Sequence, residues 1–115
     1  MDKEEYKSTM KEAYSNLKYT LKRNATIAIM GLGMSYLLLQ YNNSLINDLS
    51  TQLKENSMTN EEKVGLYFST INKMQDIQNT AIGFGGASGL GLILGLGIPI
   101  AGYKKKKKLL EKEVN

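Results

Sequence analysis

Two long segments of this chain contain no charged residue, and they limit its possible folds more than any other feature. The first runs from Ala25 to Tyr41, which is seventeen residues, and the second from Ile77 to Tyr103, which is twenty-seven. The hydrocarbon core of a bilayer is about 30 Å thick, so a helix needs roughly 20 residues to cross it. The sequence therefore predicts an all-α protein built on a two-pass transmembrane helical hairpin.

The remaining residues hold all the charges, although the whole-chain averages of 42% hydrophobic and 23% charged resemble those of a soluble protein. Five segments follow from this division. We expect an amphipathic N-terminal helix over 1–24, a first transmembrane helix over 25–41, a polar helical connection over 42–79, a glycine-rich transmembrane helix over 80–103 and a basic tail over 104–115.

The charged segments predict the orientation of the hairpin. Their net charges are +2 for residues 1–24, −2 for 42–79 and +4 for 104–115. Short basic flanks stay on the cytoplasmic side of a membrane, or on the matrix side in a mitochondrion. We therefore expect both termini inside and the connection outside. The membrane is a bacterial plasma membrane or a mitochondrial inner membrane, which the sequence does not distinguish.

The N-terminal segment has an apolar stripe at helical spacing. Its members are Tyr6, Met10, Ala13, Tyr14, Leu17 and Leu21, and lysines flank it at Lys7, Lys11, Lys18 and Lys22. Such a helix can lie on an anionic membrane surface with its lysines toward the headgroups. The alternative is that the stripe packs against another subunit or another part of the same chain.

The connection is predicted to be a helical pair. Leucines and isoleucines keep a helical period after the first span, which extends that helix to about Glu55, and Asn56–Asn60 is a natural turn. Thr59 followed by Glu62 has the spacing of a capping box, in which a side chain closes the start of a helix. A second helical period follows from Val64 to Met74, so two antiparallel helices on the outer side are expected.

Small residues dominate the second span, which contains eight glycines between residues 80 and 103. Gly83, Ala87, Gly91 and Gly95 recur at every fourth position, and on the first span Ala28, Gly31 and Ser35 share a face. Small residues let helix backbones approach closely in lipid. The row on the second span packs either against the first span or against other chains, and the glycine density favours other chains. Pro99 is expected to bend the last turns of this span.

No residue pattern points to catalysis, metal binding or a cofactor. The chain has no Cys and no His, and the uncharged segments offer no acid, base or activated nucleophile. The glycines around Gly83 lack the third glycine of a dinucleotide loop. We therefore expect a non-enzymatic protein without a small-molecule substrate.

A run of five consecutive lysines directly follows the second span, and it consists of Lys104, Lys105, Lys106, Lys107 and Lys108. These lysines are predicted to anchor the inner end of the span and to attract anionic lipid headgroups. No aromatic or groove-reading element accompanies them, so nucleic acid is not an expected partner.

The leading functional hypothesis is a small accessory subunit that packs through its glycine-rich helix into a larger membrane complex or a homo-oligomer. In its length, two apolar runs and lysine-rich tail the chain is similar to two-span phage holins, although their connection is usually short; a holin-like pore is the first alternative. A membrane immunity or exclusion protein is the second. The glycine-rich hairpins of rotary ATP synthase rings carry a buried carboxylate that both spans here lack. No family is assigned, because no resemblance includes a specific motif or extends beyond the two spans.

Overall fold

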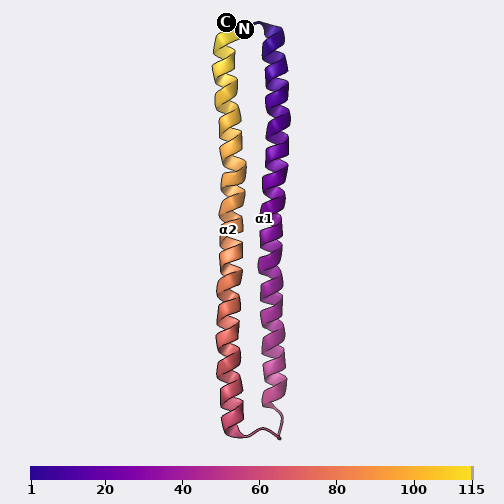
Figure 1. The fold of residues 1–115 in the computed structure, drawn as a ribbon, viewed down its shortest axis with the longest axis vertical. Coiled ribbons are helices and arrows are strands. Elements are labelled where there is room, and N and C mark those ends of the chain that lie inside the picture. Colours follow the sequence, from indigo (N-terminus) through magenta and orange to yellow (C-terminus); the bar gives the residue numbers. More distant parts are fainter. Residues whose placement is uncertain (115) are drawn as a thin grey trace. The chain divides into compact units, whose positions relative to one another are not determined.

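The computed structural model describes residues 1–114, and within this range the chain forms two α-helices and no strand. Helix α1 spans Lys3–Leu53 and helix α2 spans Asn60–Val114 (Figure 1). Contacts along the helices divide the chain into two units. Unit 1 contains Met1–Ile29 and the chain from Ser88 onward, and unit 2 contains Met30–Ala87. The all-helical fold class is confirmed.

Both helices begin at a side-chain cap. At the start of α1 the backbone N–H of Glu5 donates to Oδ1 of Asp2 at 2.8 Å. At the start of α2 the backbone N–H of Glu62 donates to Oγ1 of Thr59 at 3.1 Å, as the Thr59–Glu62 spacing predicts. These caps satisfy backbone donors that have no partner inside the helix, and the acidic residues of each first turn complement the helix dipole.

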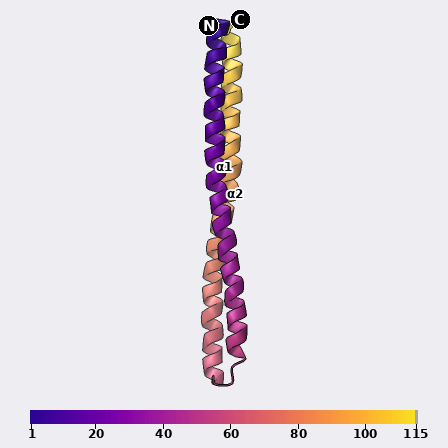
Figure 2. The ribbon, with the colours of Figure 1, turned by 90° about the vertical axis from the view of Figure 1, so that its right-hand side faces the viewer.

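Unit 1 is an antiparallel helical pair in which the first half of α1 lies beside the second half of α2 (Figures 1 and 2). The hydroxyl of Tyr6 donates to Oε1 of Glu111 at 3.2 Å. The rings of Tyr14 and Tyr103 meet edge to face with centroids 6.3 Å apart. The predicted apolar stripe of the N-terminal segment is half-buried here, except for Tyr14, which is 52% exposed. The stripe therefore packs against the chain's own second helix.

The basic segment after the second uncharged run is helical. Helix α2 continues through Pro99 and through the lysine run to Val114. All five lysines of the run are exposed, namely Lys104, Lys105, Lys106, Lys107 and Lys108. No secondary structure was assigned to this basic tail from the sequence, and its lysines lie on a regular helix in unit 1. Because five consecutive positions of a helix point in all directions around its axis, the run presents charge on every open side of α2 rather than on one face.

Unit 2 is a helical hairpin closed by a short turn between Leu53 and Asn60. Backbone bonds from Lys54 and Glu55 to carbonyls three residues earlier tighten the end of α1. Asn42 on α1 donates through Nδ2 to the carbonyl of Met74 on α2 at 3.1 Å, and Leu49 is buried. The connection is therefore the antiparallel helical pair that its apolar period predicts.

Candidate functional site

Small and polar side chains fill the space between α1 and α2 within each unit. We call these buried and half-buried residues the seam, which contains Asn24, Ala28, Ser88 and Gly95 in unit 1 and Ser35, Asn42, Ala81 and Gly85 in unit 2. Ala81 is the least exposed residue, at 1%. Small residues in the seam bring the two backbones close together, which is typical of helices that associate in lipid.

Many large apolar side chains of the uncharged segments point away from the seam, whereas Leu38, Ile77, Leu92 and Leu96 are half-buried between the helices. Ile27, Leu90, Ile93 and Ile98 in unit 1, and Met30, Leu37 and Ile82 in unit 2, are each between 61% and 69% exposed. A helix of a water-soluble protein buries such residues in a stripe that faces its core. In the uncharged segments this pattern is partly reversed, because most residues between the helices are small and many large apolar ones are exposed, as expected where the surroundings are apolar.

Among residues 1–114, one helix is long and apolar enough to cross a membrane by length and composition, and that helix is α2. Its most apolar stretch has a mean hydropathy of 1.8, and 6% of that stretch is buried. The uncharged part of α1 is shorter and includes Ser35, Gln40 and Tyr41, which lower its hydropathy.

A hydrogen bond in unit 1 compensates for Pro99. Proline has no N–H, so the carbonyl four residues before it, that of Gly95, loses its helical donor. Nδ2 of Asn24 donates to this carbonyl at 2.8 Å. The close approach also favours a glycine, because a Cβ at position 95 would lie 3.0 Å from Cβ of Asn24 and would crowd it. Asn24, Gly95 and Pro99 thus form one interdependent contact.

A second close approach lies in unit 2. Oγ of Ser35 donates to the carbonyl of Ala81 at 2.8 Å. A Cβ at Gly85, one turn further along α2, would lie 3.1 Å from the same Oγ. Hydroxyl and amide groups that bond across helices hold pairs together in apolar surroundings.

Asn42 makes the third polar contact and is only half satisfied. Its side chain is 9% exposed, and among the described residues its Oδ1 is a buried acceptor without a hydrogen-bond partner. Its Nδ2 donates to the carbonyl of Met74, which in a regular helix already accepts a bond from the amide four residues later. Asn42 therefore contributes less to satisfying the backbone than Asn24 does.

The predicted row of small residues on α2 mostly faces away from α1. A Cβ at Gly83 or Gly91 would meet no neighbour within 4 Å, and Ala87 is exposed, whereas Gly95 contacts Asn24. Each step of four residues turns about 40° beyond a full helical turn, so the row rotates about 120° over three steps. The seam instead alternates steps of four and three, which keeps its residues on one side.

The three predicted residues of α1 do lie on the side of that helix that packs. Ala28 is 5% exposed, Gly31 is half-buried, and Ser35 forms the contact with Ala81 described above. The residues of α2 that contact α1 are therefore mostly not those of the predicted row. Gly95 is the residue that belongs to both groups.

The predicted anchor on α2 lies apart from the seam contacts. Its members Lys104, Lys105, Lys106, Lys107 and Lys108 are exposed and follow directly after Tyr103, whose ring meets that of Tyr14. Their role as a lipid and topology anchor stays a prediction, because it concerns a membrane and not a contact within the chain.

The end of unit 1 that contains the chain termini includes a tyrosine with a shifted pKa. The pKa of Tyr6 is raised, first by desolvation and then by the negative charge of Glu111, which accepts the bond from the phenol, with a further contribution from Tyr103. No group of three or more His, Cys, Asp or Glu side chains that could hold a metal ion occurs in residues 1–114.

Sequence reasoning missed Asn24 and Asn42, although a signal was present. Asn24 lies seven residues before Gly31, and Asn42 lies seven residues after Ser35. A seven-residue repeat places all four on the packing side of one helix. The four-residue separation of Gly95 and Pro99 also shows that the carbonyl of Gly95 lacks its helical donor. It does not show that Asn24 replaces that donor.

Comparison with known proteins adds no assignment. No protein-family model matches the chain. Neither a curated protein nor a solved structure matches it. The functional argument therefore depends on the residues and geometry described above.

Proposed function

We propose that this chain is a small, non-catalytic integral membrane protein that serves as a structural subunit of a larger membrane complex or homo-oligomer. In this proposal the uncharged parts of α1 and α2 cross the membrane as a two-pass hairpin. The observation that carries it is the partial exchange of faces in the uncharged segments: most residues between the helices are small or polar, and many large apolar residues are exposed.

The seam hydrogen bonds support this placement. Asn24 and Ser35 donate to backbone carbonyls of the opposite helix, so these two side-chain donors are satisfied inside their own units. An unsatisfied polar group in hydrocarbon costs several kcal/mol. The exposed isoleucines and leucines would then contact lipid or another subunit.

The free row of small residues supports packing with other chains. Gly83 and Ala87 in unit 2, and Gly91 in unit 1, are exposed, and both glycines have open space around them. Packing within the chain does not use them. They would let a helix of a second copy or of another subunit approach α2 closely.

The proposed topology places both termini inside. Lys104–Lys108 would hold the inner end of α2, and the turn between Leu53 and Asn60 would lie outside. Val64, Tyr67 and Phe68 on the outer part of α2 are 45% to 60% exposed and would be available to a partner on that side.

The test is a Gly91→Leu substitution, read by crosslinking and by native-gel size in a mild detergent. A Cβ at position 91 meets no neighbour within 4 Å in the chain, so loss of assembly would report a contact with another molecule. Gly97→Leu is the matched control, because Gly97 also has open space but lies about 120° around the helix from Gly91. We expect Gly91→Leu to reduce the assembled fraction and Gly97→Leu to leave it nearly unchanged.

Three results would count against the subunit proposal. Gly91→Leu could remain in the same assembly at normal abundance, which would mean that the row is not an interface. Overproduction of the wild-type chain could dissipate the membrane potential, which would favour a holin-like pore. A gene neighbourhood with a toxin or prophage would instead favour an immunity or exclusion protein.

A further inference from the structure

We propose that unit 1 binds one anionic phospholipid in a groove on α1, with the phosphate at Arg23 and an acyl chain along Ile27. This proposal rests on the membrane placement given under the proposed function and adds a specific ligand site to it. The site is separate from Lys104–Lys108 and from the row of small residues on α2.

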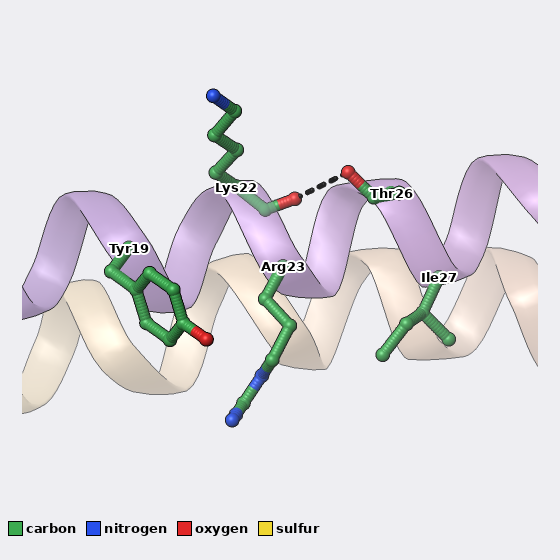
Figure 3. A pocket seen from close by; sticks show the side chains of 5 residues that line it. All are labelled: Tyr19, Lys22, Arg23, Thr26 and Ile27. Carbon is green, nitrogen blue, oxygen red and sulfur yellow. Dashed lines mark hydrogen bonds between the residues drawn. The ribbon is translucent and has the colours of Figure 1, made fainter.

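The groove has a volume of about 220 Å³ and is lined by Tyr19, Lys22, Arg23, Thr26 and Ile27 (Figure 3). The side chains of Tyr19, Arg23 and Ile27 extend to the same side, whereas that of Lys22 extends the other way. Oγ1 of Thr26 donates to the carbonyl of Lys22 at 2.8 Å, so this hydroxyl is already engaged. The groups available to a ligand are therefore a phenol, a guanidinium and an aliphatic chain.

The order of these groups matches the order of groups in a phospholipid. Tyr19, Arg23 and Ile27 follow one another at four-residue steps, each about 6 Å along the helix. Tyr19 is 69% exposed and Ile27 is 62% exposed, so both ends of the groove are accessible. Ile27 lies inside the uncharged segment, and Arg23 is the last charged residue before it. A headgroup, a phosphate and an acyl chain would fit in that order.

In unit 1, the way the two helices pair brings charged and apolar surfaces together near Arg23. The contacts Tyr14–Tyr103 and Asn24–Gly95 place the basic end of the N-terminal segment beside the last uncharged turns of α2. Ile98 in those turns is 65% exposed. Basic and apolar side chains therefore occur at the same depth in unit 1, as they do at the boundary between lipid headgroups and acyl chains.

The positive charge at this level has no nearby acidic residue to balance it. Between Glu12 and Asp48 on α1 there is no Asp or Glu, and on α2 there is none between Asp76 and Glu111. An unpaired guanidinium next to an apolar phase is costly, and a phosphate is its best geometric partner because two N–H groups can bond two oxygens. A free phosphate would leave the apolar half of the groove empty, so the whole groove favours a lipid.

The test measures lipid retention by the purified full-length chain in a mild detergent, using native mass spectrometry with added phosphatidylglycerol or phosphatidylcholine. We expect the wild-type chain to retain one phosphatidylglycerol in preference to phosphatidylcholine. Arg23→Gln should weaken this retention about tenfold, since a charged hydrogen bond is lost. Lys18→Gln is the matched control, because it removes the same charge at an exposed position outside the groove, about 140° around the helix from Arg23, and it should change retention less than about twofold.

Two further measurements separate the effect of charge from that of guanidinium geometry, and a lipid from a free phosphate. Arg23→Lys keeps the charge but loses the forked geometry, so its retention should fall between those of the wild type and Arg23→Gln. Water-soluble glycerol phosphate in excess should fail to displace the lipid, because the Ile27 contact requires an acyl chain. Displacement by glycerol phosphate, or equal loss in Arg23→Gln and Lys18→Gln, would overturn the proposed site.

Carbonate extraction of membranes distinguishes this proposal from the proposed function. A chain that resists extraction but shows no preference for phosphatidylglycerol would contradict the lipid site and leave the integral membrane assignment intact. A chain released by carbonate would contradict both. Circular dichroism of each variant confirms that helix content is retained, as expected for exposed residues.

Discussion

Nδ2 of Asn24 donates a 2.8 Å hydrogen bond to the carbonyl of Gly95, which lacks its own helical donor because Pro99 follows four residues later. The proline and the asparagine lie on different helices, and the cost of the first is offset by the second. The pairing also explains why residue 95 is a glycine, since a Cβ there would crowd Asn24.

The first prediction is that Asn24→Ala destabilises unit 1 by about 1–2 kcal/mol, because it leaves a carbonyl in the seam without a donor. In a Pro99→Ala background the same substitution should cost less than about half as much, since the restored N–H returns to Gly95. The measurement is a double-mutant cycle of unfolding in mixed micelles. Equal costs in both backgrounds would show that Asn24 does not compensate for the proline; Asn16→Ala, at an exposed position, is the control.

The second prediction compares two neighbouring glycines in unit 2. Gly85→Ala should lower stability, because the new Cβ would lie 3.1 Å from the Oγ of Ser35 and would disturb its bond to Ala81. Gly86→Ala meets open space and should be neutral or stabilising by up to about 1 kcal/mol, the gain in helix propensity. Thermal unfolding of both variants measures the difference. If Gly86→Ala were the more damaging substitution, the helix facing described for unit 2 would be incorrect.

The third prediction concerns Asn42, whose Oδ1 is buried without a partner among the described residues. Asn42→Leu should stabilise unit 2, by about 1 kcal/mol, because it removes an unsatisfied acceptor and adds apolar contact. A buried asparagine also fixes the register of paired helices, so the variant should show more than one pairing. Crosslinks between cysteine pairs across unit 2 would detect the shift. A stability loss comparable to that of Asn24→Ala would argue that Oδ1 has an unseen partner such as a bound water.

The fourth prediction follows from the raised pKa of Tyr6. The neutral phenol donates to Glu111, so this contact contributes below about pH 10, the ordinary tyrosine pKa, and is lost as the pH rises through the higher folded value. Difference absorbance between the wild type and Tyr6→Phe should locate the transition above pH 10. Glu111→Gln should lower the pKa of Tyr6 without fully normalising it, because desolvation, the largest cause, remains. Glu113→Gln is the matched control, and an unchanged pKa in Glu111→Gln would contradict this assignment.

The fifth prediction concerns orientation and uses the absence of cysteine in the native chain. Single cysteines at Ser8, Ser57 and Val114 should react with an impermeant thiol reagent from outside only at Ser57. The charge blocks of +2, −2 and +4 provide the physical reason. Labelling of Ser8 or Val114 in sealed cells would reverse or abolish the proposed topology.

Much of the fold could be predicted from local patterns. The helical periods, the turn before Asn60 and the cap at Thr59 depend on residues within a few positions of one another, and the structure contains all three. The apolar stripe that includes Tyr6 and Leu17 was also visible. The surface against which this stripe packs could not be predicted. Choosing between a membrane surface, another subunit and α2 requires knowing which distant segments of the chain meet.

The small residues of α2 also show that local patterns do not reveal which face of a helix contacts its partner. A strict four-residue row from Gly83 to Gly95 is conspicuous in the sequence, but the seam follows Ala81, Gly85 and Ser88, whose spacing is less regular. The rotation of the helix relative to its partner decides between them, and it depends on contacts such as that of Ser35 with Ala81. Such a hydrogen bond joins residues that are far apart in the sequence, so the periodicity of either helix alone does not reveal it.

The hydrogen bonds of the seam join only neutral groups: the amides of Asn24 and Asn42, the hydroxyl of Ser35 and backbone carbonyls. If these helices cross a membrane, the transmembrane voltage does almost no work on this part of the chain, since the work scales with charge moved, at about 2.3 kcal/mol per elementary charge per 100 mV. The seam would hold equally well in an energised and a depolarised membrane. Any response to voltage would have to come from the lysine-bearing ends of the chain or from a partner protein.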